Sequence, residues 1–412
     1  HNLQTMDVMR QVAMKHDLFV TMHEKPFARV NGSGKHVNWS IGDNTGTNYL
    51  EPSASPLKNI SFLLTLGAFM LGVDKFGGVL RACVADAGND HRLGASEAPP
   101  AIMSIYLGEY LTLLIDEIER MGKPTEQVMA NINMGVRNLP RISKDYSDRN
   151  RTSPIAFTGN KFEFRAVGSS QNPSEAVTLL NQLCTYGFFA IEKRLAQHKE
   201  KDIRESSLLV LKDVFKETRR VRFEGNGYSE EWHKQAEKLG LPNARNTPAA
   251  LNAYLEPEVI ELMEKTHVLS EREVCAKVEI KLENYVKTKE IEYRTAVNMA
   301  RTQIMPALVK QINAVASAAA AAKTAGAASK SLTAEVKRFD AFYSDIQQFT
   351  DRLEAVLVRA DNKDNHHKKA EFLAEAGEDA LEQLREVVDR AEQAVAHEFW
   401  PMAKYQELLT VL

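Results

Sequence analysis

Two short segments of the chain alternate apolar and polar residues, a pattern that predicts two half-buried β-strands. Successive side chains of a strand point to opposite sides, so each segment has one apolar and one polar face. The first segment sets Val37, Trp39 and Ile41 against His36, Asn38 and Ser40, and the second sets Phe162 and Phe164 against Lys161, Glu163 and Arg165. Each apolar face is suited to packing on a core, which leaves the polar face for other contacts.

Much of the remaining sequence shows the spacing of buried or amphipathic helices. Residues 3–15 follow a helical period, and residues 57–84 predict one or two buried helices that break at the glycine pair beginning at Gly77. Pro100 is well placed to begin a helix over residues 101–121. These helices would cover the predicted strands.

After residue 195 the chain changes to long charged helices. Ser270 and Glu273 have the spacing of a capping box, and the helical stretch that they begin is interrupted near Pro306. Two further helical patterns, joined by a polar turn at residues 361–368, predict an antiparallel pair. We therefore expect three regions, which comprise residues 1–195, 196–330 and 331–412.

The composition is that of a soluble globular protein, with 44% hydrophobic and 26% charged residues. A net charge of -3 gives no hint of a nucleic-acid or membrane partner. Three widely spaced cysteines indicate a reducing compartment without a disulfide framework or a cysteine-based zinc site. Residues 59–73 are the longest uncharged stretch, which is shorter than the ~20 residues that span a bilayer and predicts a buried helix. The chain begins at His1 without an initiator Met, and no signal peptide is visible, so we expect its natural start to lie upstream.

The two polar faces carry the candidate chemistry. A glycine-rich turn at residues 31–34 precedes the first strand, and its glycines would let a ligand approach the backbone closely. On the second strand Glu163 lies between Lys161 and Arg165, an arrangement that suits a metal ligand beside groups that hold anions. Taken alone, either strand is also compatible with an ordinary half-exposed strand whose polar residues face water.

Two polar loops and one histidine pair add weaker candidates. Residues 86–100 could act as a lid, and an arginine within residues 137–151 could clamp phosphate, although solvated loops are the commoner fate of such segments. His366 and His367 could ligate a metal, but a solvated turn is again the commoner outcome. Walker, Rossmann, nucleophile-elbow and zinc-protease motifs are absent from the sequence.

Four motifs, in this order along the first half of the chain, together resemble the glutamine synthetase family. They are Asn31-Gly-Ser-Gly-Lys-His36 followed by Asn38 and Ser40, Arg92 through Glu97-Ala-Pro, Asn150-Arg151-Thr-Ser, and Lys161-Phe-Glu163-Phe-Arg165. The stretches at residues 23–27, 88–100 and 158–165, with the long helical extension, resemble the large type III branch. The resemblance implies an α+β fold in which an antiparallel sheet is covered by helices and followed by a long all-helical C-terminal extension.

The resemblance also implies a role for each matching position. His36 and Glu163 match ligands of the divalent ion, Mg²⁺ or Mn²⁺, that bridges the nucleotide phosphates. The residues that match substrate glutamate contacts are Asn31, Gly32, Arg92 and Arg165, and those that match ATP contacts are Asn38, Ser40, Arg151 and Lys161. The implied catalytic groups are Glu97, which closes the site and takes a proton from ammonium, with Arg151 and Arg165 on the phosphoryl group.

The implied activity is that of an ATP-dependent ligase that forms glutamine from glutamate and ammonia through γ-glutamyl phosphate. The implied assembly is a cytoplasmic homo-oligomer, a dodecamer of two hexameric rings, without a nucleic-acid or membrane partner. Two alternatives stay open: a γ-glutamyl ligase that uses another amine, and a non-catalytic structural homologue.

The sequence departs from the family pattern in places. Better-known types carry a further arginine where this chain has Ala156, their segment before the metal-ligand glutamate is longer, and their spacing from Arg92 to Glu97 is one residue wider. In the family, the ligands of a second metal and a small N-terminal domain precede the point that His1 matches. We therefore expect this chain to be the C-terminal portion of a longer enzyme with an incomplete site of its own.

Overall fold

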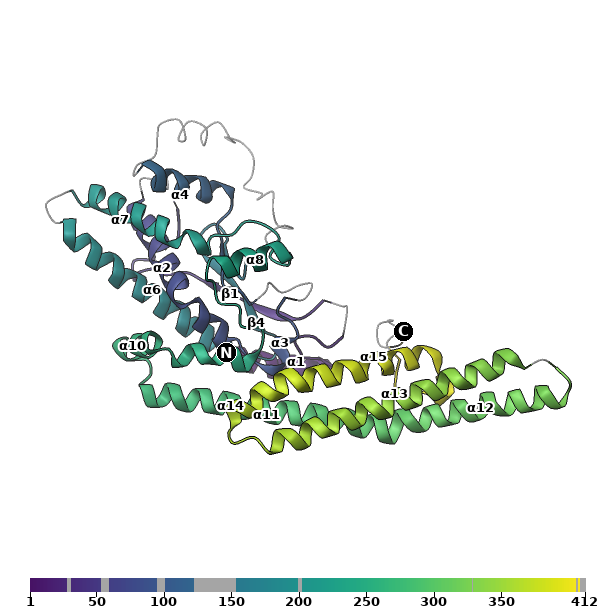
Figure 1. Cartoon of the computed structure of the whole chain (residues 1–412). Helices are drawn as coiled ribbons and strands as arrows, with labels where there is room; N and C mark the ends of the chain where they lie inside the picture. Colours follow the sequence, from purple (N-terminus) through teal and green to yellow (C-terminus); the bar gives the residue numbers. More distant parts are fainter. Residues whose placement is uncertain are drawn as a thin grey trace, which may run out of the picture. The chain divides into compact units, whose positions relative to one another are not determined.

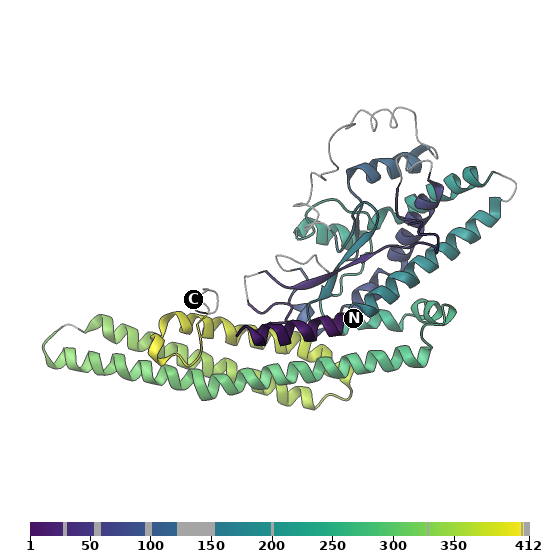
Figure 2. The same cartoon turned by 180° about the vertical axis from the view of Figure 1, so that it is seen from behind.

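A computed structural model describes residues 1–27, 31–52, 59–94, 101–121, 153–198, 202–327, 329–404 and 407 of the chain (Figures 1 and 2). The chain forms two compact units, His1–Val278 and Glu279–Leu412, and each is described by itself. The boundary between the units falls within one long helix, α11 (Glu271–Met299).

The first unit contains a sheet with the strand order β1-β4-β3-β2. The strands are β1 (Gly34–Trp39), β2 (Ile105–Tyr106), β3 (Ile155–Phe157) and β4 (Phe162–Gly168). β4 pairs in antiparallel fashion with both β1 and β3, whereas β2 runs parallel to β3. The α+β fold is therefore confirmed, and the sheet is mixed rather than wholly antiparallel.

A β-bulge interrupts the pairing of β1 with β4. Lys35 pairs with Val167 and Val37 pairs with Phe164, so the single residue His36 lies opposite both Arg165 and Ala166. The extra residue belongs to β4, and a bulge of this kind disrupts the ladder of backbone hydrogen bonds around it. Before the bulge, from Phe162 to Phe164, apolar and polar residues alternate between the two faces as predicted.

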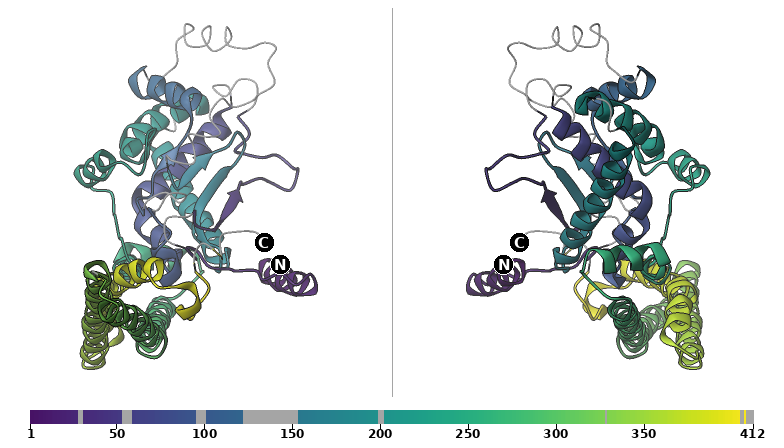
Figure 3. Two further views of the ribbon diagram at one scale, coloured as in Figure 1. Left: turned by 90° about the vertical axis from the view of Figure 1, so that its right-hand side faces the viewer. Right: turned by 90° about the vertical axis from the view of Figure 1, so that its left-hand side faces the viewer.

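The apolar face of the sheet packs on α2 (Ile60–Cys83). The ring of Phe69 on α2 stacks on Trp39 of β1 and on Phe162 of β4, with centroids 5.2 Å and 4.0 Å apart. Trp39 also donates from Nε1 to Asn181 of α6 (Ser174–Leu195) at 2.8 Å. The helices that cover this face are visible in both views of Figure 3. The strands thus bury one face and leave His36 and its neighbours on the other.

α2 and α6 lie against each other within this unit (Figure 1). The expected break at Gly77 is displaced, because α2 continues through the glycines and its non-helical residue is Phe76, with φ -122° and ψ 22°.

By length and hydropathy alone, Ile60–Cys83 and Glu271–Thr324 would each pass as membrane spans, with 78% and 22% of their apolar windows buried. The burial of α2 is that of a core helix, as expected for residues 59–73.

The helix expected over residues 101–121 is shorter than predicted. Ile105 and Tyr106 form β2, and α4 begins only at Glu109 and ends at Met121. Gly108 between them has a φ of +82°, a backbone conformation that side chains disfavour. Pairing with β3 therefore takes residues that the proline-based prediction assigned to the helix.

Further helices complete the first unit. α1 (Asn2–Lys15) agrees with the predicted helix. The others are α3 (Ala87–Asp90), η3 (Ala196–His198), α7 (Ile203–Glu217), η4 (Thr218–Val221), α8 (Glu230–Lys238), α9 (Thr247–Leu251), η5 (Asn252–Leu255) and α10 (Pro257–Lys265).

The second unit is helical in its described residues. After α11 come a π-helical turn (Ala300–Ile304), α12 (Met305–Thr324), α13 (Lys330–Asp361), α14 (His366–Phe372), a second π-helical turn (Leu373–Gly377), α15 (Glu378–Ala394) and η8 (His397–Phe399). The interruption expected near Pro306 is present as the first of these turns. α13 packs on both α12 and α15, which confirms the predicted helix pair. His366 is paired with Glu279 on the surface rather than gathered with other ligands.

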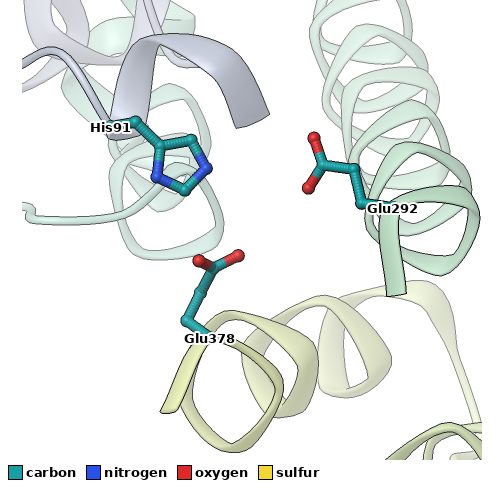
Figure 4. A group of neighbouring side chains, drawn as sticks. All are labelled: His91, Glu292 and Glu378. Atoms are coloured by element: carbon teal, nitrogen blue, oxygen red, sulfur yellow. The ribbon is translucent and has the colours of Figure 1, made fainter. Parts of the chain in front are cut away.

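A buried lysine links α11 to the start of α15. Nζ of Lys289, whose side chain is 1% exposed, lies 2.9 Å from Glu292 and 2.7 Å from Glu378. Figure 4 shows both carboxylates on their helices. Burial lowers the pKa of Lys289, but the two carboxylates outweigh it and raise that pKa. Tyr293 donates to Leu373 O in the second π-helical turn, 2.9 Å away, so this cluster holds the turn in place.

Candidate active site

His36 and Glu163 lie on the same face of the sheet and contact each other. Asn38 is the direct partner of Glu163 in the pairing of β1 with β4, which makes His36 a diagonal neighbour of that carboxylate. Nδ1 of His36 lies 2.9 Å from Oε1 of Glu163. The side chain of Glu163 is 11% exposed and that of His36 is 45% exposed. The structure thus brings together the two predicted metal ligands, and their role as ligands stays a prediction.

Arg165 holds the second oxygen of the same carboxylate. Its Nε donates to Oε2 of Glu163 at 3.1 Å, and its side chain is 2% exposed. This ion pair fixes the orientation of Glu163 so that Oε1 faces His36. One strand therefore supplies both a carboxylate and a cation to the site, as alternation predicted for these two residues.

A carboxylate oxygen is a ligand that suits Mg²⁺ and Mn²⁺, and an imidazole nitrogen is a ligand of divalent transition ions. Among the described residues, no third histidine, cysteine or acidic side chain joins His36 and Glu163 within reach of one ion. Such ions commonly take one or two protein ligands and complete their shell with water and substrate phosphates. The two residues therefore fit the ion that the sequence predicts.

Arg92 and Asn89 bind the backbone carbonyls at the bulge. Arg92 donates from Nη2 to Arg165 O at 2.9 Å and from Nη1 to Val167 O at 3.3 Å, and Asn89 donates from Nδ2 to Ala166 O at 2.9 Å. Buried carbonyls that a bulge releases from the ladder need such partners. Arg92 is 3% exposed, so its guanidinium serves the backbone here, and the predicted contact with substrate glutamate stays a prediction.

The glycine-rich turn fits closely around Arg92. A Cβ on Gly34 would lie 2.1 Å from Nη2 of Arg92, and a Cβ on Gly32 would lie 3.2 Å from its Cγ. These glycines therefore make room for a side chain of the protein itself, whereas the sequence suggested room for a ligand. The arginine and the turn form one packed unit beside the site.

Glu24 is a buried acid beside this turn that the sequence analysis did not single out. It is 2% exposed, and its carboxylate accepts hydrogen bonds from Ser170. The signal available in the sequence was a charged residue in the segment that leads directly into the glycine turn.

The other described candidates surround the pair. Asn31, Asn38 and Ser40 are exposed, Gly32 is half-buried, and Lys161 is half-buried directly before β4. Nζ of Lys161 lies 3.4 Å from Oδ1 of Asn160. Ala156, where better-known types have an arginine, pairs with Glu163 in the sheet. The departure from the family pattern is thus located beside the predicted metal ligand.

Glu97 and Arg151 lie outside the described residues, as do the rest of the loop around residue 97 and residues 137–151. Their roles in proton transfer and phosphate binding stay predictions.

Comparison with known proteins assigns two parts of the chain to one family. Residues 2–91 match the family model described as the glutamine synthetase catalytic domain, and residues 207–323 match that of the glutamine synthetase C-terminal domain. The first match includes the glycine-rich turn and His36, and the second lies in the helices that follow β4 and α6.

Three curated relatives align with 99% of the chain. They are a glutamine synthetase of Bacteroides fragilis at 37% identity, a type-3 glutamine synthetase of Dictyostelium discoideum at 35%, and a glutamine synthetase of Butyrivibrio fibrisolvens at 34%. The chain spans 58%, 57% and 58% of their respective lengths. The two family models and these relatives agree, and the chain belongs to the glutamine synthetase family.

Proposed function

We propose that the chain is part of a type III glutamine synthetase, an ATP-dependent ligase that forms glutamine from glutamate and ammonia. The observation that carries this proposal is the contact of 2.9 Å between His36 and Glu163, with Arg165 on the other carboxylate oxygen. Within this family, these groups are expected to gather nucleotide phosphates and a glutamate carboxylate in one place.

The reaction proposed has two steps. An oxygen of the γ-carboxylate of glutamate attacks the γ-phosphorus of ATP, and the bond from that phosphorus to ADP breaks, which yields γ-glutamyl phosphate. Ammonia then attacks the acyl carbon and inorganic phosphate leaves. The first step brings anions together, and fixed cations such as Arg165 and Arg151 lower its barrier by offsetting their charge.

His36 and Glu163 would hold a divalent ion, which when bound supplies further positive charge at the nucleotide phosphates. Asn38 and Ser40 would contact the nucleotide, and Lys161 would lie near ATP. Arg92, Asn31 and Gly32 would bound the place of glutamate. Glu97 would take the proton that ammonium loses and would exclude water when its loop closes.

The proposed setting is a cytoplasmic homo-oligomer, a dodecamer of two hexameric rings. Light scattering coupled to size-exclusion chromatography of the enzyme expressed from its whole gene tests the ring. A monomeric mass in the active enzyme would overturn this part of the proposal.

The activity is tested with the enzyme expressed from its whole gene, supplied with glutamate, ammonium, ATP and Mg²⁺ or Mn²⁺. We expect glutamine, ADP and phosphate in equal amounts. Formation of γ-glutamylamides from other amines, with little glutamine, would favour the alternative ligase. Absence of ATP binding in the presence of either metal would favour a non-catalytic homologue.

Replacing Glu97 by alanine separates chemistry from nucleotide binding. We expect glutamine synthesis to fall by at least about 100-fold, because general acid–base groups contribute on this order. ATP affinity, measured by calorimetry, should stay close to that of the unaltered enzyme. An equal loss of ATP binding would contradict the role of Glu97 in proton transfer.

A further inference from the structure

Glu24 has no role in the chemistry proposed above, yet it is 2% exposed. A carboxylate is rarely buried to this extent unless hydrogen bonds or opposite charges compensate for the loss of water. Oε1 of Glu24 accepts hydrogen bonds from the backbone nitrogen of Ser170 at 2.9 Å and from its hydroxyl at 2.6 Å. Ser170 follows β4 by two residues, so this carboxylate is attached to the end of the strand that carries Glu163 and Arg165.

The space around the carboxylate is shaped by glycines. A Cβ on Gly168, the last residue of β4, would lie 2.4 Å from Oε1 of Glu24. A Cβ on Gly88, in the segment that leads to Arg92, would lie 2.7 Å from Oε2. Side chains at these two positions would displace the carboxylate. The end of β4 and the segment that leads to Arg92 therefore both meet the carboxylate of Glu24.

The backbone of Glu24 holds the glycine-rich turn. Its carbonyl oxygen accepts a hydrogen bond from the backbone nitrogen of Ser33 at 2.7 Å. A Cβ on Gly32 would lie 2.8 Å from this same oxygen. The side chain of Glu24 thus fixes a residue whose main chain carries the turn, and it ties that turn to the end of β4.

We infer that Glu24 is a positioning residue, which sets the place of the Asn31–Gly34 turn relative to β4 and thereby the glutamate contacts that the turn provides. This inference rests on the proposed function, which assigns Asn31 and Gly32 to substrate glutamate. Glu24 does not reach the His36–Glu163 pair through any described hydrogen bond. Its loss should therefore affect glutamate more than the metal-bound nucleotide.

The test compares Glu24→Ala and Glu24→Gln in the enzyme expressed from its whole gene. Glutamine retains an oxygen that can accept both hydrogen bonds from Ser170, whereas alanine cannot. We expect Glu24→Ala to raise the KM for glutamate by about tenfold or more, since displacements near 1 Å can cost up to 100-fold. The KM for ATP should change by less than about twofold, and Glu24→Gln should restore most of the glutamate affinity.

A matched control separates positioning from general destabilisation. Asp74 of α2 is a half-buried carboxylate elsewhere in the same unit, and its Oδ1 lies 2.7 Å from Nε of Arg220. Asp74→Asn should lower the melting temperature without raising the KM for glutamate. If Glu24→Ala does not fold, Ser170→Ala removes one donor to Glu24 at an exposed residue and should shift the same KM by a smaller factor.

Hydrogen exchange gives a readout that does not depend on activity. In Glu24→Ala the amide of Ser33 should exchange faster than in Glu24→Gln. An unchanged KM for glutamate in Glu24→Ala, or an equal rise for glutamate and ATP, would overturn the inference. If the unaltered enzyme forms no glutamine, the proposed function fails instead, and the exchange at Ser33 still reports whether Glu24 holds the turn.

Discussion

Gly34 is expected to be intolerant of any side chain, because the guanidinium of Arg92 occupies the space beside it. A Cβ at this position would lie 2.1 Å from Nη2, 2.2 Å from Cζ and 2.7 Å from Nε of Arg92. A flexible arginine on the surface would move aside at little cost. Arg92 is 3% exposed and donates to carbonyls at the bulge of β4, so it cannot move without breaking those hydrogen bonds.

The cost of Gly34→Ala follows from the hydrogen bonds that a displaced Arg92 could no longer make. The two bonds from its guanidinium, to Arg165 O and Val167 O, would break or lengthen. Hydrogen bonds to a charged group each contribute about 1.5–3 kcal/mol, so we expect a loss of about 3 kcal/mol or more in the free energy of unfolding. For a unit of this size, that corresponds to a fall in melting temperature of roughly 6–12 °C.

Thermal unfolding followed by circular dichroism measures this effect, with Gly78→Ala as the matched control. Gly78 lies in the helical part of α2, and a Cβ there would meet the nearest atom, Cβ of Ala253, at an ordinary 3.4 Å. Gly78→Ala should be neutral or stabilising by up to about 1 kcal/mol, since alanine favours the helix. Equal melting temperatures for the two variants would refute the account of Arg92.

Replacing Glu163 by alanine should weaken nucleotide binding in the presence of Mg²⁺ or Mn²⁺ by about tenfold or more, since it removes one proposed holder of the ion; an unchanged dissociation constant in calorimetry would exclude it from the ion. The exposed Cys275 should react with a thiol reagent before the buried Cys184, because burial raises the pKa of Cys184 to about 12 and keeps its thiol protonated. Mass spectrometry of the labelled folded protein checks this, and equal rates at both residues would contradict it. Hydrogen bonds from neighbouring residues lower the pKa of Asp43 to about 2, and the bond from the Thr45 side chain contributes most. Its folded pKa is therefore below the ordinary value of about 3.9, and the loop should be stabilised above that pH and lose this stabilisation as the pH falls through about 2; an NMR titration with a midpoint near the ordinary value would count against these hydrogen bonds.

The alternation of residues was sufficient to predict the two faces of the central strands. Trp39 and Phe162 pack on α2, while His36 and Glu163 share the opposite face. Within each strand, the polar residue lies an odd number of positions from the apolar one, so the two point to opposite faces. This inference succeeds because the side-chain period of a strand is a local property. The meeting of the two strands came from the family resemblance, since a local pattern does not specify its partner.

The bulge and β2 could not be predicted in this way. The sequence Arg165-Ala166-Val167 contains no glycine to mark a bulge, and the register is visible only once β1 and β4 are paired. β2 has two residues, and its formation depends on β3, which lies far along the chain. Arg92 was assigned to substrate by resemblance, and its contacts with backbone carbonyls appear only when the bulge is known.

The extra residue in β4 also divides that strand into two halves under separate constraints. Upstream of Ala166, the phase of the strand places Glu163 and Arg165 on the same face as His36. Downstream of Ala166 the phase is shifted by one residue, so that Val167 lies on the same side as Lys35. This shift also brings Ser170 to the position where its backbone nitrogen donates to Glu24. A deletion of one residue here would leave the half that carries Glu163 in place and turn the side chains of the other half to the opposite face. Homologous sequences should therefore tolerate exchanges at this point far better than changes in length.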